Sequence, residues 1–350
     1  MYKEKPKMNF KNRKIFLTLL LIILIILTGC STYISTTPTT QMPQHSCTAT
    51  VNESVWPFSI AIIPDTQQEV IIDSAIKNKH FLNRCQWLVN NKNELNLRCV
   101  VHTGDVVNWG NVDESQFIIA SEAMKVFETA KIPVIYAIGN HDTAAVGAGG
   151  GAAVPSETIK RVRDTSVFNK YFSTQRYDYL VTKDDGIIDN SYYCFEEAGA
   201  KWMILSLELW PRTEVVNWAK AVVETHPRHN IMIVTHSYLN SNGSILTNNG
   251  GYGANSPKYV YDNLISQYSN IKFVFCGHTG NALVVPKVCE NGNKIVTILG
   301  AFHSNLKNPV RIFNVDVANG SVYGTIYCPL DGEEWSQYRF NIEGLSFIVE

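Results

Sequence analysis

The chain has 350 residues, of which 45% are hydrophobic and 17% are charged, and its formal net charge is −1. This length allows one large domain or two small ones. The nearly neutral charge and the lack of a basic stripe give no support for a nucleic-acid-binding protein, because such proteins rely on Lys and Arg contacts to the phosphates.

Residues 1–30 have the pattern of an export signal. Lys and Arg residues before position 15 precede an apolar run at 15–27, which is shorter than the roughly 20 residues of a membrane span. The sequence Leu27-Thr28-Gly29-Cys30 follows, and it resembles the lipobox of bacterial lipoproteins. That resemblance implies cleavage before Cys30 and a lipid on its thiol; the alternative is an uncleaved signal anchor. In both cases we expect an exported protein that is anchored to the membrane on its extracytoplasmic face.

A tether is predicted between this signal and the folded domain. Residues 31–54 are rich in Thr, Ser and Pro and show no apolar period, which is typical of an extended, solvated linker. Residues 55–350 show neither an internal repeat nor a second linker, so we expect them to form a single domain. Beyond Cys30 there are seven cysteines, none of them at zinc-binding spacing.

The first part of this domain alternates strands and helices. Apolar runs at 58–63, 98–102 and 134–138 predict strands, and helical apolar spacing occurs at 72–91 and 114–131. Apolar strands that alternate with helices pair in parallel within a sheet that is covered on both faces. The first three strands are therefore predicted to be parallel.

A long segment at 143–189 interrupts this alternation. It contains a Gly- and Ala-rich tract at 146–154 and partly helical spacing at 159–172. Loops of this length inside a compact domain are usually functional lids or disordered segments. The segment is predicted to be either a lid over a site or a mobile insertion with no catalytic part.

Strands and helices resume after this segment. Strands are predicted at 190–195, 202–207, 231–235 and 271–276, and helices at 213–226 and 257–268. From residue 283 onward, short strands alternate with turns rich in Asn and Gly, which predicts a second, antiparallel sheet.

Polar side chains follow five of these apolar strands. The carboxyl ends of strands in an α/β sheet are where ligands bind, so these side chains are expected to meet. Carboxylates, imidazoles and amide oxygens are metal-ligand and acid–base groups, although a capped turn would also explain the Asn-His-Asp sequence. The residues at the five strand ends are Asp65 and Gln67, Asp105, Asn140, His141 and Asp142, His236, and His278.

The order and spacing of these strand ends resemble the calcineurin-like metallophosphoesterases. The resemblance covers residues 58–278 and rests most on Gly104-Asp105 and Gly139-Asn140-His141-Asp142. It implies an α/β fold of four layers, α/β/β/α, in which two mixed sheets form a sandwich. A closer likeness, through Pro64-Asp65-Thr66-Gln67 and Thr235-His236-Ser237-Tyr238, is to an exported bacterial branch in which Gln replaces the first-motif His.

The resemblance also implies a cofactor of two divalent metal ions. Mixed nitrogen and oxygen ligands suit Mn, Fe, Zn or Co. Asp105 corresponds to the carboxylate that bridges both ions, which together would clamp a phosphate. The further ligands implied are Asp65 and Gln67 for one ion, and Asn140, His236 and His278 for the other.

Three more residues have predicted roles in the reaction, of which that of His141 is implied by the resemblance. His141 corresponds to the residue near the leaving-group oxygen, where it would donate a proton or stabilise charge. Asp142 would orient the His141 ring through a hydrogen bond. Arg212 is the first choice for a contact to the substrate phosphate, although a salt bridge with Glu208 is the favoured alternative.

The last motif departs from the family pattern. The family has Gly-His-x-His, whereas this chain reads Gly277-His278-Thr279-Gly280. The missing histidine and Gln67 both weaken the same ion site, because an amide oxygen is a weaker ligand than an imidazole. This ion site would load only when substrate is present, or water, Asn281 or His303 would replace the lost ligand. For His303 a structural role is the favoured alternative.

The predicted function is metal-dependent hydrolysis of a phosphate-ester substrate outside the cytoplasm. The alternative is a lipid-anchored binding protein on a phosphoesterase fold with weakened catalysis, which the missing histidine and Gln67 motivate. The type of ester does not follow from the fold.

Overall fold

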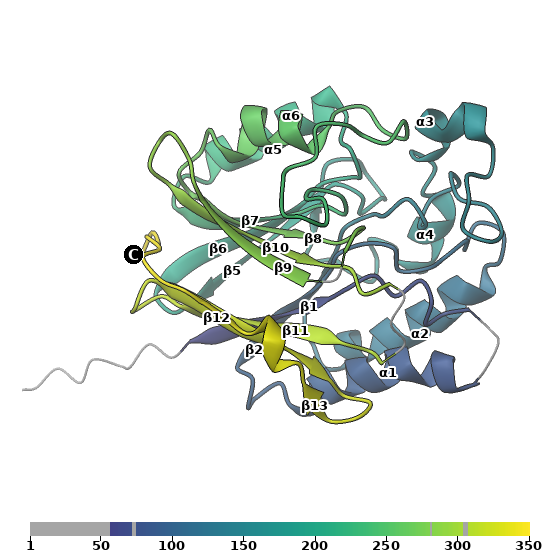
Figure 1. Ribbon diagram of the computed structural model, residues 1–350, viewed down its shortest axis with the longest axis horizontal. Helices are drawn as coiled ribbons and strands as arrows, with labels where there is room; N and C mark the ends of the chain where they lie inside the picture. The colour runs from purple at the N-terminus through teal and green to yellow at the C-terminus, as the bar shows by residue number, and fades with distance from the viewer. Residues whose placement is uncertain (1–56, 72–74, 281, 304–306) are drawn as a thin grey trace, which may run out of the picture. The chain divides into compact units, whose positions relative to one another are not determined.

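The computed structural model describes residues 57–71, 75–280, 282–303 and 307–350. These residues belong to one compact unit (Figure 1). The predicted signal at 1–30, with the lipidation site Cys30, and the tether at 31–54 lie outside the described residues. Within the described part of the chain, no helix is long and apolar enough to cross a membrane.

The first sheet contains both parallel and antiparallel strands. It consists of β1 (Phe58–Ile63), β2 (Leu97–His102), β3 (Val134–Tyr136), β11 (Val310–Asp316), β12 (Ser321–Cys328), β13 (Glu333–Glu334) and β14 (Phe340–Ile342). Its order is β13-β12-β11-β1-β2-β3, and β14 pairs with β12. Strands β1, β2 and β3 are parallel, as predicted, while β11 lies antiparallel to β1.

The second sheet is also mixed. It consists of β4 (Val181–Thr182), β5 (Ser191–Glu197), β6 (Ala200–Ser206), β7 (His229–Val234), β8 (Ile271–Cys276), β9 (Ala282–Val288) and β10 (Lys294–Gly300). Its order is β4-β5-β6-β7-β8-β10-β9. The central strands β6, β7, β8 and β10 are parallel, and β5 and β9 run antiparallel to their neighbours β6 and β10.

The two sheets pack face to face around a shared apolar core. In β1, Ile60 and Ile62 belong to the core between the sheets, whereas Ala61 and Ile63 belong to the core under the helices. Every residue of β1 is buried, which explains why this strand reads as an unbroken apolar run. Each large apolar side chain contributes roughly 1.5–3 kcal/mol on burial, so the sandwich holds its strand ends in fixed positions.

Helices cover the outer face of each sheet. Helices α1 (Ala75–Asn90) and α2 (Ser115–Thr129) pack on the first sheet, and α5 (Thr213–Thr225), α6 (Pro257–Val260) and the π-helical turn η2 (Tyr261–Ile265) pack on the second (Figure 1). In α2, the residues Phe117, Ala120, Met124 and Phe127 recur at three- and four-residue spacing and are all buried. The layers are therefore α/β/β/α, and the predicted fold class is confirmed.

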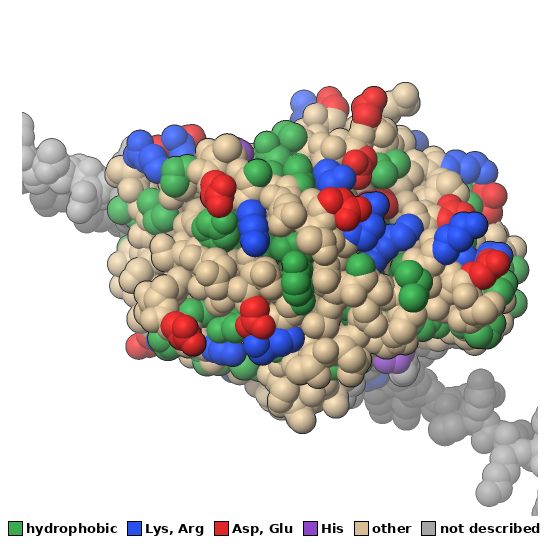
Figure 2. Space-filling model, turned by 90° about the horizontal axis from the view of Figure 1, so that it is seen from above, with side chains coloured by type: hydrophobic (Ala, Val, Ile, Leu, Met, Phe, Trp, Pro, Cys, Tyr) green, Lys and Arg blue, Asp and Glu red, His purple; other side chains and the backbone are tan. Residues whose placement is uncertain are grey.

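Charges of both signs are mixed on the face seen in Figure 2. Lys and Arg side chains there lie beside Asp and Glu side chains. Exposed ion pairs also occur among the described residues; Lys258 of α6, for example, lies 2.6 Å from Asp262 of η2. The described residues of this face therefore present neighbouring charges that offset one another.

The prediction that the residues after 283 form a second, antiparallel sheet of their own is wrong. Strands β9 and β10 extend the second sheet, with Val296 of β10 opposite Phe273 of β8 in a parallel pair. Strand β11 pairs instead with β1 of the first sheet, with Phe313 opposite Ile60. Local alternation predicted strands in this region, but the partner of each strand depends on residues far away in the chain.

The 143–189 segment is partly built into the core. It contains the 3-10 turn η1 (Pro155–Glu157), α3 (Thr158–Arg161) and α4 (Ser166–Tyr171), in agreement with the predicted partial helix. Phe168 and Phe172 are fully buried and contact the rings of Phe117 and Tyr136. These contacts attach the second half of the segment to α2 and to the first sheet.

Candidate metal centre

The strand ends of both sheets meet at one edge of the sandwich. Nδ1 of His236, which follows β7 of the second sheet, lies 2.7 Å from the carbonyl oxygen of Thr103, which follows β2 of the first sheet. The backbone N–H of His278, after β8, donates to Oδ2 of Asp65, after β1, at 2.9 Å. The structure thus brings together polar residues that are up to 213 positions apart in the sequence.

Three side chains lie at the centre of this site. Asp105, His236 and His278 each offer one ligand atom, and these atoms lie within 4.8 Å of one another. Nε2 of His236 lies 3.1 Å from Oδ2 of Asp105 and 3.1 Å from Nδ1 of His278. A carboxylate oxygen and two imidazole nitrogens at this spacing are donors that suit Mn, Fe, Zn or Co.

Two glycines make room for the buried carboxylates. A Cβ atom on Gly139 would lie 2.1 Å from Oδ1 of Asp105, and a Cβ atom on Gly277 would lie 2.1 Å from Oδ1 of Asp65. Both distances are far below van der Waals contact, so any side chain at these positions would displace a carboxylate. The glycines that precede Asn140 and His278 are therefore part of the site.

Two amide side chains have buried oxygens with no hydrogen-bond partner among the described residues. They are Oε1 of Gln67 and Oδ1 of Asn140. The amide nitrogen of Gln67 donates to Oδ2 of Asp105 at 3.3 Å, so this side chain already reaches the central cluster. Because buried oxygens normally have a partner, the two amides fit a site for divalent ions, which would supply one.

The buried charges of the site favour a bound cation. Burial raises the pKa of Asp65 well above its ordinary value, and nearby His236 offsets this only in part. Burial also opposes ionisation of Asp105, but His236 and His141 outweigh it and lower the pKa of Asp105. Burial disfavours the protonated form of His236, yet the Asp105 and Asp65 carboxylates raise its pKa to about 10. Two buried carboxylates therefore share one imidazolium, and a divalent ion would neutralise them better.

His278 is present as a neutral imidazole. Burial, reinforced by the charge on His236, lowers the pKa of His278 to about 4. The neutral ring is the form that binds metals. The indole of Trp210 lies edge-on to this ring, with centroids 5.6 Å apart, and limits the positions that the ring can take.

The structure corrects the predicted role of Asp142. Its carboxylate accepts hydrogen bonds from three backbone N–H groups rather than from the ring of His141. That ring is oriented by the carbonyl oxygen of Asn108, 2.6 Å from Nδ1. The reason is the tight turn closed by the Asp142 N–H and the Gly139 carbonyl oxygen, at 3.3 Å, which directs the carboxylate back toward residue 139. The three donors are the N–H groups of Val106 at 2.8 Å, Val107 at 3.2 Å and Gly139 at 2.9 Å.

Sequence reasoning missed the backbone groups that orient the ligands. The carbonyl oxygens of Thr103 and Asn108 fix the rings of His236 and His141. Both residues lie within three positions of Asp105 in the sequence. Their closeness to a predicted metal ligand is the one feature of the sequence that could have indicated this role. His102, which the sequence left open between site and core, is fully buried; it accepts from the Gly104 N–H at 3.2 Å and contacts Thr66 Oγ1 at 3.1 Å.

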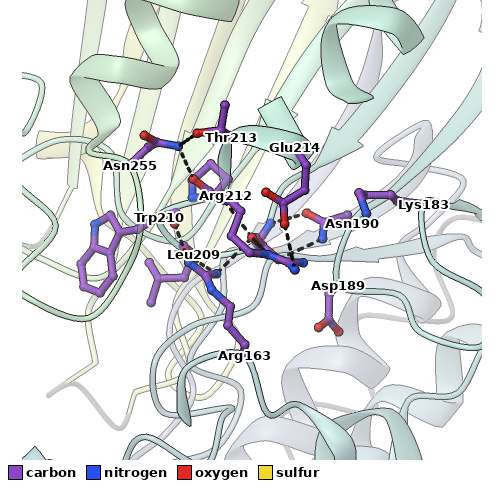
Figure 3. Close-up of polar contacts among 12 residues, drawn as sticks. Arg163, Lys183, Asp189, Asn190, Leu209, Trp210, Arg212, Thr213, Glu214 and Asn255 are labelled. Carbon is purple, nitrogen blue, oxygen red and sulfur yellow. Dashed lines mark hydrogen bonds and ion pairs between the residues drawn. The ribbon is translucent and has the colours of Figure 1, made fainter. Parts of the chain in front are cut away.

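Arg212 lies in an ion-pair network (Figure 3). Its Nε and Nη2 atoms contact both carboxylate oxygens of Glu208, at 2.9 and 3.0 Å. Nη1 of Arg163 lies 3.2 Å from the same carboxylate. The salt bridge favoured as the alternative for Arg212 is therefore present, and a contact between Arg212 and a substrate stays a prediction.

The last motif ends at Gly280 in a left-handed backbone conformation. This residue has a φ of +69°, and a Cβ atom there would lie 3.5 Å from Ser241 and 3.8 Å from Leu299. Of the two residues predicted to replace the lost ligand, Asn281 lies outside the described residues. His303 is half-buried, and its Nδ1 has no hydrogen-bond partner within the described part of the chain. A ligand role for His303 stays a prediction.

A family model matches the part of the chain that carries these residues. The match is to the calcineurin-like phosphoesterase family and covers residues 58–281. The chain therefore belongs to that family, as the order of its strand ends predicted. The description of this family as phosphoesterases agrees with the predicted enzyme class, a metal-dependent phosphoester hydrolase.

Individual relatives are more distant. The uncharacterized protein YvnB of Bacillus subtilis (strain 168) is 25% identical over 205 residues, which are 58% of this chain but only 14% of that protein. A crystal structure of a dimetal phosphatase from Danio rerio matches with a TM-score of 0.50 at 11% identity, covering 82% of this chain and 98% of that one. A predicted phosphoesterase from Streptococcus pneumoniae TIGR4 matches with a TM-score of 0.33 at 9% identity, covering 83% and 99%. At these identities the Danio rerio structure supports the fold and does not assign an activity.

Proposed function

We propose that this protein hydrolyses a phosphate ester at a site for two divalent metal ions. The supporting observation is the convergence of Asp105, His236 and His278 beside the unpartnered buried oxygens of Gln67 and Asn140. A buried cluster of carboxylates and imidazoles lowers stability unless each charge is matched, so its presence is better explained by a function than by folding.

The ligand assignment follows the positions of these side chains. Asp105 would be shared by both ions, because Gln67 and His236 both contact its Oδ2 atom and are proposed ligands of different ions. The metal, which is Mn, Fe, Zn or Co, would polarise the phosphate and lower the pKa of a water molecule. The proposed further ligands are Asp65 and Gln67 for one ion, and Asn140, His236 and His278 for the other.

The proposed role of His141 is to protonate the departing alcohol. Its backbone N–H donates to Oδ1 of Asp105 at 3.0 Å, which holds it beside the shared carboxylate. The carbonyl oxygen of Asn108 can only accept, so Nδ1 carries a hydrogen and Nε2 is the nitrogen left for the substrate. When protonated at Nε2, the ring would pass that proton to the leaving-group oxygen as the P–O bond breaks.

The proposal is tested with full-length protein in detergent and Mn²⁺. We expect the wild type to hydrolyse an aryl phosphomonoester, a phosphodiester, or both. Asp105→Ala should have no measurable activity, and His141→Ala should lose about 10²–10⁴-fold in kcat. Glu94→Ala, which removes an exposed carboxylate, is the matched control and should keep wild-type rates. Equal rates for wild type, Asp105→Ala and His141→Ala on every ester would refute the proposal.

A second candidate function is a binding protein with weakened catalysis. Two features favour it. Gly280 supplies no metal ligand, and a Cβ atom there would lie near Ser241 and Leu299. Gln67 supplies a neutral amide oxygen, which is a weaker ligand than an imidazole. Metal content separates the two candidates. Two metal equivalents per chain after dialysis support the phosphoesterase, whereas one or none, together with absent turnover, supports the binding protein.

The proposed location is the extracytoplasmic face of a membrane, with Cys30 as the lipidated residue. The supporting pattern is the basic segment, the apolar run and the sequence Leu27-Thr28-Gly29-Cys30. In a bacterial host fed a labelled fatty acid, the wild type should incorporate the label and sediment with membranes. Cys30→Ser should do neither, and unchanged labelling of that variant would contradict the proposal.

A further inference from the structure

A short hairpin in the 143–189 segment reaches over the site. It is closed by a bridge between Val146 and Ala152, by a hydrogen bond from Gly147 N to Gly151 O at 2.8 Å, and by one from Gly150 N to Gly147 O at 3.0 Å. The hairpin begins only four residues after Asp142, so it stays close to the reaction residues. Its tip, at residues 148–151, carries three consecutive glycines.

Gly150 is the residue of this tip that faces the site. A Cβ atom on Gly150 would lie 3.3 Å from Oδ1 of Asn108 and 3.5 Å from Cε1 of His141. Gly149 has the same φ, +85°, but a Cβ atom there would meet nothing within 4 Å. The two neighbours therefore share one backbone requirement for glycine, while only Gly150 borders the His141 ring.

The position of Gly150 along the ring has a chemical consequence. Cε1 lies between the two ring nitrogens of His141, and Nδ1 is engaged by the Asn108 carbonyl oxygen at 2.6 Å. The other nitrogen, Nε2, is left for the substrate, so the space at Gly150 adjoins the path of the leaving group.

The hairpin is anchored at its base. The N–H of Ala144 donates to the Asp164 carbonyl oxygen at 3.0 Å, and the N–H of Ala153 donates to the Ala145 carbonyl oxygen at 2.8 Å. Ala145 is fully buried in a cluster with Val162, Leu209 and Trp210.

A neighbouring arginine attaches the same segment to the second sheet. Arg163 donates to the carbonyl oxygens of Leu209 and Trp210, at 2.8 and 2.7 Å (Figure 3). It also pairs with Glu208, at 3.2 Å. Because these contacts hold residues 163–164, to which Ala144 is bonded, the hairpin forms a fixed wall.

We propose that this hairpin forms the leaving-group side of the site and that Gly150 determines which esters are accepted. A side chain at position 150 would come within 3.5 Å of the Asn108 amide and the His141 ring, so it would narrow the space in which the leaving group departs. This inference rests on the proposed phosphoesterase function and deepens it: Gly150 determines specificity, and its replacement should select against larger leaving groups.

The test compares Gly150→Ala with Gly149→Ala in the full-length, Mn²⁺-loaded protein. Phenyl and 2-naphthyl esters of the hydrolysed phosphate type serve as substrates, because their leaving groups differ in size more than in acidity. We expect the ratio of kcat/KM for naphthyl over phenyl to fall about tenfold in Gly150→Ala and to stay within twofold of wild type in Gly149→Ala. Inhibition by inorganic phosphate, which has no leaving group, should be unchanged in both.

Each outcome has a distinct meaning. An equal change of the ratio in both variants, or no change in either, overturns the inference while the wild-type turnover upholds the proposed function. Absence of wild-type turnover on both esters refutes the two together. Both variants carry the same backbone strain, and Gly150→Ala adds a 3.3 Å contact with Asn108, so its melting temperature should equal that of Gly149→Ala or lie slightly below it. If Gly150→Ala does not fold, Gly150→Asn and Gly149→Asn replace the pair, because Asn tolerates positive φ better.

Discussion

Nε2 of His236 lies 3.1 Å from Oδ2 of Asp105, and these two buried side chains belong to different sheets. Asp105 follows β2 of the first sheet, and His236 follows β7 of the second. An ion held by both residues would link the two sheets. Because the ion would bind the folded protein and not the unfolded chain, it would also stabilise the fold.

Removal of divalent ions is therefore expected to lower the free energy of unfolding. At a metal concentration of 100 times Kd, the gain from binding is about 2.7 kcal/mol. The Tm of the full-length protein should be higher in Mn²⁺ than in chelator, and His236→Ala should lose most of this difference. Glu94→Ala is the control and should keep it. A metal-dependent shift of equal size in His236→Ala and wild type would speak against this site.

Replacement of Asp142 by Asn should destabilise the protein. The carboxylate accepts three backbone N–H groups, and the NH₂ group of Asn would face at least one of these donors. We expect a loss of about 2–4 kcal/mol in the free energy of unfolding, measured by denaturant titration. Activity should fall as well, because the same N–H groups position Asp105 and Gly139. Asp316→Asn, at the partly exposed end of β11, is the control, and equal stability of the two variants would contradict the role given to Asp142.

The Glu208 network should make stability depend on pH. Burial opposes ionisation of Glu208, but Arg212 and Arg163 outweigh it and lower its pKa below the ordinary 4.5. Its folded pKa is thus below its unfolded pKa, so its contribution is present above pH 4.5 and is lost as the pH falls through the folded value.

Glu208→Gln should accordingly lose about 1.5–3 kcal/mol at pH 7, measured by denaturant titration. The difference from wild type should shrink as the pH falls below 4.5. A difference that stays constant from pH 7 to pH 3 would show that Glu208 acts through its shape and not through its charge.

Restoring the family histidine at position 280 should not restore a metal ligand. Gly280 has a φ of +69°, and its side-chain direction leads to Ser241 and Leu299. Gly280→His should cost about 1–2 kcal/mol of stability, from the left-handed backbone, and leave the metal content unchanged.

Gln67→His is the informative counterpart. The side chain at position 67 already reaches Asp105, so an imidazole there should increase the metal retained after dialysis, measured by elemental mass spectrometry. If Gly280→His instead retained more metal than Gln67→His, the orientation of the last motif would have to be revised.

Sequence reasoning predicted that the strand-end residues would meet, and in the structure Asp105, His236 and His278 do lie together. Asp105, Asn140 and His236 each follow a buried apolar run, and the sheets place the ends of these runs at one edge. It failed where the outcome depended on partners far apart in the chain. The strands after residue 283 divide between both sheets, which periodicity along one strand does not reveal.

The layered fold and the kinds of side chain at the strand ends could be predicted from the sequence, because apolar period and glycine position are properties of neighbouring residues. The family followed from the resemblance of the strand-end motifs. How those side chains are used, in contrast, depends on the tertiary structure. Asp142 binds three backbone N–H groups, His141 is held by the Asn108 carbonyl oxygen, and Gly150 borders the ring of His141. These relations depend on the angle at which each turn leaves its strand and on the element packed against it, and both are set by the whole fold.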